Sequence, residues 1–165
     1  MARLNTRQIA LTAVMSATSV VIAYSKGLAA PSLPGVIEFM TVLIFVSGFC
    51  FGRLVGSIIG IISLTIYMLI PYPFAHPGAW LFSTSPILLA VMAALGGMFG
   101  IVGALTSRFL DPAKKRRFIF TLGFLGLVLT FIYDIMSSVG FALAYPAFTN
   151  IWQAIVLTFI PLYYP

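Results

Sequence analysis

Apolar residues run through this chain in long stretches, separated by short polar or proline-containing connections. A transmembrane helix needs about 20 mostly apolar residues, with a range of roughly 17–25. One helix over residues 36–70 would be about 52 Å long, well beyond the roughly 30 Å hydrocarbon core, so the chain must turn near Phe51-Gly52-Arg53. The pattern therefore predicts an all-α membrane protein, a bundle with six spans at residues 8–24, 36–51, 54–70, 87–105, 118–145 and 151–162.

The fifth predicted span is too long for a straight crossing. At 1.5 Å per residue, residues 118–145 extend about 42 Å, so this helix must tilt or break. We expect the break at Ser137-Ser138-Val139-Gly140. The chain contains no internal repeat and no linker, which indicates one domain over residues 1–165.

The positions of Lys and Arg predict how the chain is oriented. Eight of the nine precede the first span or lie in the connections between spans two and three and spans four and five, and only Lys26 lies on the other side. Cytoplasmic loops accumulate Lys and Arg, so we expect a multi-pass protein of the plasma membrane with its N-terminus inside. The eight residues are Arg3, Arg7, Arg53, Arg108, Lys114, Lys115, Arg116 and Arg117.

The composition supports the membrane assignment. Hydrophobic residues make up 61% of the chain and charged residues 7%, whereas a soluble domain has about 45–50% and about 25%. The net charge of +6 comes from loop residues, which favours contact with anionic lipid headgroups over nucleic acid. Cys50 is the single cysteine, so there is no disulfide framework.

Two acidic residues fall within predicted spans. Glu38 lies near the outer end of the second span, and Asp134 lies in the outer half of the fifth. An ionisable group inside a membrane costs at least about 2.5 kcal/mol, so both are candidates for substrate binding. Two structural alternatives stay open: Glu38 as a headgroup-level helix cap, and Asp134 as a hydrogen-bond partner of a neighbouring helix.

Aromatic residues gather around the proline-rich connection before the fourth span. Tyr67, Tyr72, His76 and Trp80 accompany Pro71, Pro73, Pro77 and Pro86. Proline disfavours helix, so we expect an ordered loop whose rings line a pocket for a planar ligand; an interfacial aromatic belt is the alternative. His76 has no second His and no Cys close in sequence, so we expect no metal site, and nothing indicates a cofactor.

Known catalytic motifs are missing from the sequence. It contains no Gly-x-Ser-x-Gly, no His-Glu-x-x-His and no phosphate-binding loop. We therefore expect no enzyme, and any pumping needs another subunit or an ion gradient.

Small residues recur at helical spacing. Ala10, Ala13 and Ala17 share one face of the first span, and such a face lets another helix approach closely in a membrane. Whether this face meets another subunit or packs internally stays open. The glycine pairs at positions 56 and 60 and at 96 and 100 indicate internal packing.

Together these features resemble the substrate-binding S component of energy-coupling factor (ECF) transporters, which take up vitamins. The resemblance rests on the basic N-terminus, the Ala13-Val14-Met15-Ser16-Ala17 motif, six spans with short second and third helices, the basic connection after span four, and the stretch Tyr133-Asp134-Ile135-Met136-Ser137-Ser138. It implies a pocket in the outer half that Tyr133 helps to form. It also implies that Ala13 and Ala17 face a transmembrane coupling subunit (EcfT-like), which two ATPase subunits drive.

The charges suggest the class of substrate. The outer half offers Glu38 and Asp134 but, among basic residues, only Lys26, so we expect a neutral or cationic ring compound. Competing hypotheses are a self-sufficient, ion-coupled secondary transporter with Asp134 as a relay, a membrane enzyme, and an assembly subunit. A secondary transporter would be expected to contain an inverted repeat, and the sequence contains none.

Overall fold

The structure is a computed structural model that describes residues 5–29, 39–69, 85–110, 115–144 and 152, with the backbone alone for residues 25–29, 134 and 141. Within these ranges the chain forms α-helices and no strand. The helices are α1 (Thr6–Ala29), α2 (Phe39–Phe51), α3 (Arg53–Leu69), α5 (Pro86–Phe109) and α6 (Lys115–Ala144).

Three of these helices, α1, α5 and α6, are long and apolar enough to cross a membrane, and α2 and α3 are shorter apolar helices. The predicted all-helical class, compatible with a membrane protein, is therefore confirmed for the described residues. Five of the six predicted spans coincide with these helices. The sixth, at residues 151–162, lies outside the described residues except for Trp152.

The predicted turn between the second and third spans is confirmed. Gly52 separates α2 from α3 and has a φ of 88°, in the left-handed region that glycine adopts without strain. The Gly52 amide donates to the Gly48 carbonyl at 3.0 Å, and the Gly56 amide donates to the Gly52 carbonyl at 3.0 Å. The chain therefore reverses direction over a single residue, and α2 and α3 form a tight hairpin.

The predicted break at residues 137–140 is wrong, because α6 continues without interruption to Ala144. Gly140 instead allows a close helix contact: a Cβ there would lie 3.1 Å from side-chain atoms of both Leu88 and Val91 on α5. At 30 residues, α6 is about 45 Å long. A continuous helix of this length would have to tilt to match a bilayer.

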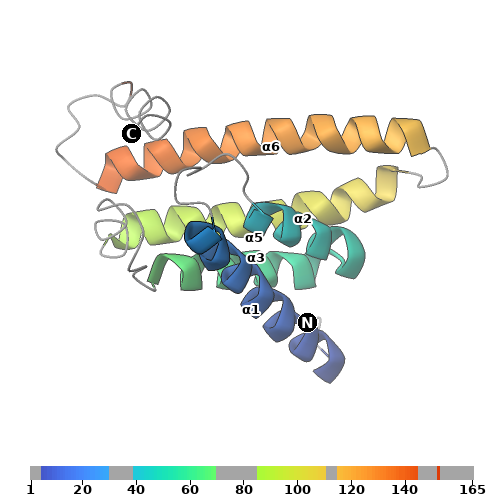
Figure 1. Ribbon diagram of the computed structural model, residues 1–165, viewed down its shortest axis with the longest axis horizontal. Coiled ribbons are helices and arrows are strands. Elements are labelled where there is room, and N and C mark those ends of the chain that lie inside the picture. The colour runs from blue at the N-terminus through green and yellow to red at the C-terminus, as the bar shows by residue number, and fades with distance from the viewer. Residues whose placement is uncertain (1–4, 30–38, 70–84, 111–114, 145–151, 153–165) are drawn as a thin grey trace.

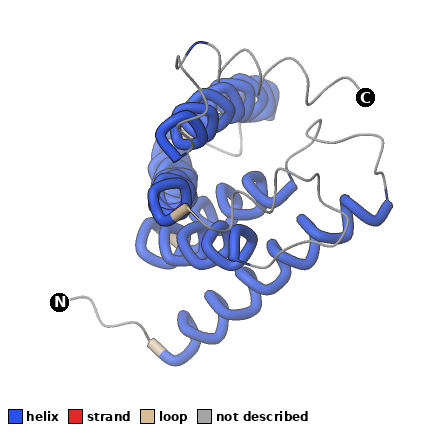
Figure 2. Tube along the Cα trace, turned by 90° about the vertical axis from the view of Figure 1, so that its left-hand side faces the viewer, coloured by secondary structure: helices blue, strands red, loops and turns tan. Residues whose placement is uncertain are grey.

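The centre of the bundle is α3, which has its largest contact with α5 and further contacts with α2 and α1. Figure 1 shows α6 lying along α5, on the side away from α3. In Figure 2, α1 crosses the other helices obliquely instead of running alongside them. The described helices therefore form a layer of α2, α3 and α5, with α6 on one side and α1 on the other.

Glycines bring α2, α3 and α5 into backbone contact. A Cβ on Gly60 would overlap the main chain of Gly96, and a Cβ on Gly100 would overlap the main chain of Gly56. The two helices are antiparallel, because residue numbers rise along α3 from Gly56 to Gly60 while those of their partners fall along α5 from Gly100 to Gly96. Such close approach is a common way for helices to associate in membranes. The internal packing predicted for the glycine pairs is thus confirmed.

Apolar side chains complete the core around these glycines. The largest side chains with almost no exposed surface come from α2, α3 and α5: Ile44, Val55, Ile59, Leu64, Leu88 and Phe99. Leu129 and Tyr133 add the buried face of α6 to the same cluster.

Candidate functional site

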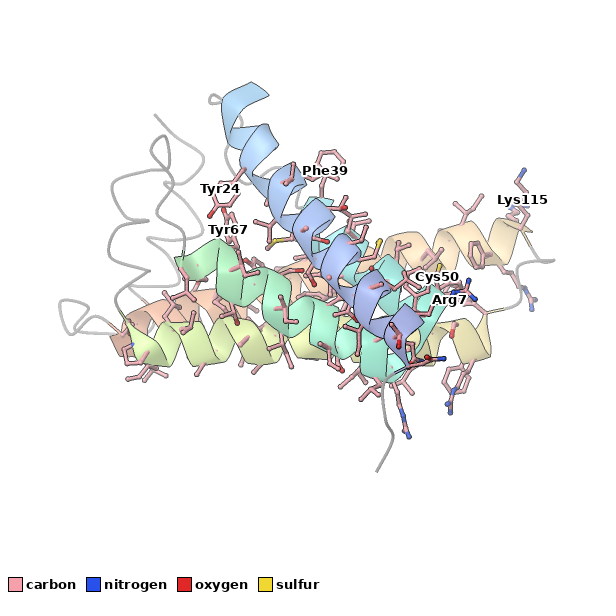
Figure 3. The ribbon with its side chains drawn as sticks, turned by 90° about the horizontal axis from the view of Figure 1, so that it is seen from below. Arg7, Tyr24, Phe39, Cys50, Tyr67 and Lys115 are labelled. Carbon is pink, nitrogen blue, oxygen red and sulfur yellow. The ribbon has the colours of Figure 1, made fainter. Side chains whose placement is uncertain are left out.

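Every basic side chain that the structure describes lies at one end of the bundle, which we call the basic end. The helices alternate in direction, so the start of α1, α3 and α6 and the last turn of α5 meet there. Figure 3 shows Arg7 and Lys115 at this end, with Cys50 from the last turn of α2. All of these basic side chains are exposed: Arg7, Arg53, Arg108, Lys115, Arg116 and Arg117.

The outward surface of α6 is apolar. Phe120 is 79% exposed, Phe124 64% and Leu127 67%. A long helix with large apolar side chains outward and a basic first turn matches a lipid-facing span that begins at the headgroup level. The charges and the apolar surface therefore agree with one membrane orientation, in which the basic end lies at one face of the bilayer.

The opposite end, which we call the far end, contains a pair of tyrosines. The rings of Tyr24 on α1 and Tyr67 on α3 have centroids 5.6 Å apart, at an interplanar angle of 45°. The Tyr24 hydroxyl donates a hydrogen bond of 3.2 Å to the backbone carbonyl of Tyr67. Figure 3 shows both residues on the same side of the bundle. Tyr67, a predicted site residue, is thus held at the far end and stays 37% exposed.

The second tyrosine predicted for the site lies elsewhere. Tyr133 on α6 is 8% exposed, and its ring centroid is 5.9 Å from that of Phe99 on α5. It belongs to the buried cluster between α5 and α6. Tyr67 is placed at the α1–α3 contact, so these two candidates occupy different helix interfaces. Asp134 follows Tyr133 in α6, and its side chain is not described.

The other predicted site residues, Glu38, Tyr72, His76 and Trp80, lie outside the described residues. In the part of the chain that the structure describes, no three His, Cys, Asp or Glu side chains gather in a way that would hold a metal ion.

The alanine face of α1 points away from the bundle. Ala10, Ala13 and Ala17 are all exposed, and they alternate with the exposed side chains of Val14 and Val21. The opposite side of α1 packs against α3 and, to a smaller extent, α2. The sequence left two roles open for these alanines, contact with another subunit and internal packing. Among the described helices the alanines do not pack internally.

The packed side of α1 carries polar residues that the sequence reasoning did not single out. Thr12, Ser16 and Ser19 are 7%, 2% and 0% exposed. Their spacing of four and three residues places them on one helix face. The same spacing can be read from the sequence, beside the alanines of the same helix.

Comparisons with protein families, with characterised proteins and with solved structures give no match.

Proposed function

We propose that this protein is the substrate-binding subunit of an ECF-type uptake transporter. In this proposal the protein binds a vitamin-like ring compound near the far end. A transmembrane coupling subunit and two ATPases then help to pass the compound inward. Three observations support the proposal: the apolar helices, the collection of basic side chains at one end, and the outward alanine face of α1.

The outward alanine face carries the proposal furthest. Small side chains on an exposed membrane helix let a second helix approach closely, whereas large apolar side chains are sufficient against lipid. On α6 the exposed surface carries large side chains such as Phe120 and Leu127, together with the exposed glycines Gly123 and Gly126. On α1, Ala10, Ala13 and Ala17 leave a shallow strip of the helix surface free for a partner. The recurrence of three exposed alanines at three- and four-residue spacing on one face favours α1 as the side that meets the coupling subunit.

The substrate class follows from charge. Asp134 lies in α6 near Tyr133, and the exposed basic side chains of the described residues lie at the other end of the bundle. A buried anion without a positive partner is costly, so the proposal favours a neutral or cationic ring held by aromatic rings and hydrogen bonds. Tyr67 at the far end supplies one exposed aromatic ring for such a contact.

Copurification with partner subunits tests the role of the alanines. The chain is expressed together with the coupling subunit and the two ATPases encoded in the same genome, and the complex is isolated through a tag on an ATPase. We expect Ala13→Trp and Ala17→Trp to abolish copurification, because the bulky ring prevents close helix approach. The matched control is Ala94→Trp, at an exposed alanine of α5, which should copurify normally. Equal copurification of all three variants would refute the partner assignment.

Substrate binding is tested separately, on the purified chain alone. Small molecules released from the protein are identified by mass spectrometry, and the compound found is titrated back. We expect a stoichiometric ring compound whose affinity falls at least about tenfold on Asp134→Asn, since a charged hydrogen bond contributes roughly 1.5–3 kcal/mol. Uptake into proteoliposomes by the chain alone, driven by an ion gradient, would instead identify a secondary transporter.

A further inference from the structure

The first turn of α6 carries an excess of positive charge. Lys115, Arg116 and Arg117 are all exposed, and that turn contains no acidic residue. The start of a helix is the positive end of its dipole, where anions are favourable and cations are unfavourable. Arg108 in the last turn of α5 lies at a negative end and has the favourable arrangement. The sequence between positions 108 and 117 has five basic residues and one acidic residue, so it retains an excess of positive charge that an external anion can neutralise.

An apolar surface begins directly beside these charges, on the outward face of α6. Phe120 lies four residues after Arg116, and therefore on the same face of the helix. Gly123 and Leu127 lie three and seven residues after Phe120 and continue this face. Phe120 and Leu127 are 79% and 67% exposed, and a Cβ on Gly123 between them would meet nothing within 4 Å. The exposed glycine thus leaves a shallow recess between two large apolar side chains.

The dimensions of this face match one leaflet of a bilayer. Arg116 and Leu127 are eleven residues apart, a rise of about 16.5 Å along the helix. Half of the hydrocarbon core is roughly 15 Å thick. A different side of α6, with Leu129 and Tyr133, belongs to the buried cluster, and α5 is the main contact of α6 among the described helices. Figure 1 shows α6 at the edge of the bundle. An acyl chain that starts at the level of Arg116 would therefore extend along the exposed face to about Leu127.

We propose that this face of α6 binds an anionic phospholipid from the leaflet at the basic end, with the phosphate beside Arg116 and Arg117 and an acyl chain along Phe120 and Leu127. Guanidinium groups bind phosphate through two parallel hydrogen bonds, and the start of a helix favours the same anion. The headgroup of an anionic lipid leaves that charge uncompensated, whereas the headgroup of a zwitterionic lipid carries its own cation. The inference rests on the membrane assignment and not on the proposed transport function.

Native mass spectrometry of the full chain, purified in detergent, tests the preference for the headgroup. Phosphatidylglycerol and phosphatidylcholine with the same acyl chains are titrated separately, and the bound lipids are counted. We expect phosphatidylglycerol to bind at least about tenfold more tightly, because each basic residue near an anionic lipid changes the affinity by roughly fivefold. Equal affinities for the two lipids would overturn the proposal. Glycerol phosphate that binds as tightly as phosphatidylglycerol would also overturn it, because the site would then bind a free anion.

A charge-matched pair of double variants tests the location of the headgroup. We expect Arg116→Gln/Arg117→Gln to lose about tenfold in affinity for phosphatidylglycerol and to leave the affinity for phosphatidylcholine unchanged. Arg7→Gln/Arg53→Gln removes the same charge from exposed positions at the basic end, and should keep the affinity within about twofold. An equal loss in both double variants would mean that charge attracts the lipid diffusely, and would overturn the site on α6.

A second pair of variants tests the apolar surface. Phe120→Ala should weaken the binding of both lipids several-fold, because the acyl chain loses a contact. Leu143→Ala is the matched control, since Leu143 is 58% exposed near the other end of α6 and should not affect binding. Unchanged binding in Phe120→Ala would overturn the assigned position of the acyl chain. The comparison of the two lipids uses the unmodified chain, so it stays decisive if a variant fails to fold.

Discussion

Replacing Gly60 by alanine provides a direct test of the contact between α3 and α5. An added Cβ would overlap the carbonyl group of Gly96 and would lie 2.9 Å from Cγ2 of Ile44. The principal obstacle is main chain in the middle of α5, which cannot rotate away as a side chain would. The two helices must therefore move apart, and the apolar contacts of the buried Ile59 and Leu64 of α3 loosen with them.

The expected change in the free energy of unfolding is the difference between two effects. Overpacking a core costs about 1–3 kcal/mol, and an obstacle of main-chain atoms places Gly60→Ala at the upper end of that range. Alanine is about 1 kcal/mol more favourable than glycine inside a helix, which offsets part of the cost. We therefore expect Gly60→Ala to destabilise the protein by about 2 kcal/mol.

Two glycines of the same chain act as matched controls. A Cβ on Gly126 of α6 would meet nothing within 4 Å, so Gly126→Ala should be neutral or stabilising by up to about 1 kcal/mol. A Cβ on Gly97 would lie 3.2 Å from Cγ1 of Ile61, a side chain that can adjust, so the change in stability should be close to zero. The three variants are heated in detergent and the folded fraction is measured by size-exclusion chromatography. The same melting temperature for Gly60→Ala and Gly126→Ala would refute the backbone contact.

Three further predictions follow from burial and exposure. Phe99→Ala should destabilise the protein by about 3–5 kcal/mol, because this 2% exposed ring packs on Tyr133, whereas Phe120→Ala, at a 79% exposed position, should change the melting temperature little. Tyr24→Phe should cost about 1 kcal/mol in the same assay, because it keeps the ring but loses the hydroxyl that donates to α3; an unchanged melting temperature would contradict this bond. Cys50, exposed at the basic end, should react with a membrane-impermeant maleimide in inside-out vesicles and not in intact cells, and the reverse result would overturn the predicted orientation.

The sequence allowed the helices to be placed because length and charge act locally. An apolar stretch of 35 residues is too long for one crossing, so the turn at Gly52 follows from bilayer thickness and from the single flexible residue beside Arg53. The collection of basic side chains at one end follows in the same way from their positions between the apolar stretches. Neither inference requires knowledge of which helices touch.

The continuity of α6 could not be predicted, because it depends on a neighbour. Ser137, Ser138 and Gly140 have low helix propensity, so the sequence alone suggested a break there. In the structure Gly140 faces Leu88 and Val91, and Ser138 is buried at 3% exposure. The close contact with α5 favours a residue without a Cβ at position 140. A sequence does not show whether a small residue ends a helix or lets another helix approach.

The arrangement of the site residues also depends on neighbouring helices, so it could not be predicted from the sequence. Both Tyr67 and Tyr133 are predicted to bind substrate; in the structure Tyr67 contacts Tyr24 and Tyr133 contacts Phe99, at two different helix interfaces. Which aromatic rings converge depends on the rotation of each helix about its own axis. Composition and spacing do not determine that rotation when almost every position of a helix is apolar.

Helix α1 shows why polar periodicity is the better guide to orientation in such a chain. Its apolar residues occur on every side, and the strongly apolar Val14 and Val21 point outward. The hydroxyls of Thr12, Ser16 and Ser19 are confined to one face, the face that packs on the bundle. Apolar side chains are favourable both against lipid and in the protein core, so they give little information about which side of a helix faces inward. A hydroxyl facing lipid is left unbonded unless its own helix accepts the hydrogen bond, and polar residues that gather on one face therefore indicate where the neighbouring helices lie.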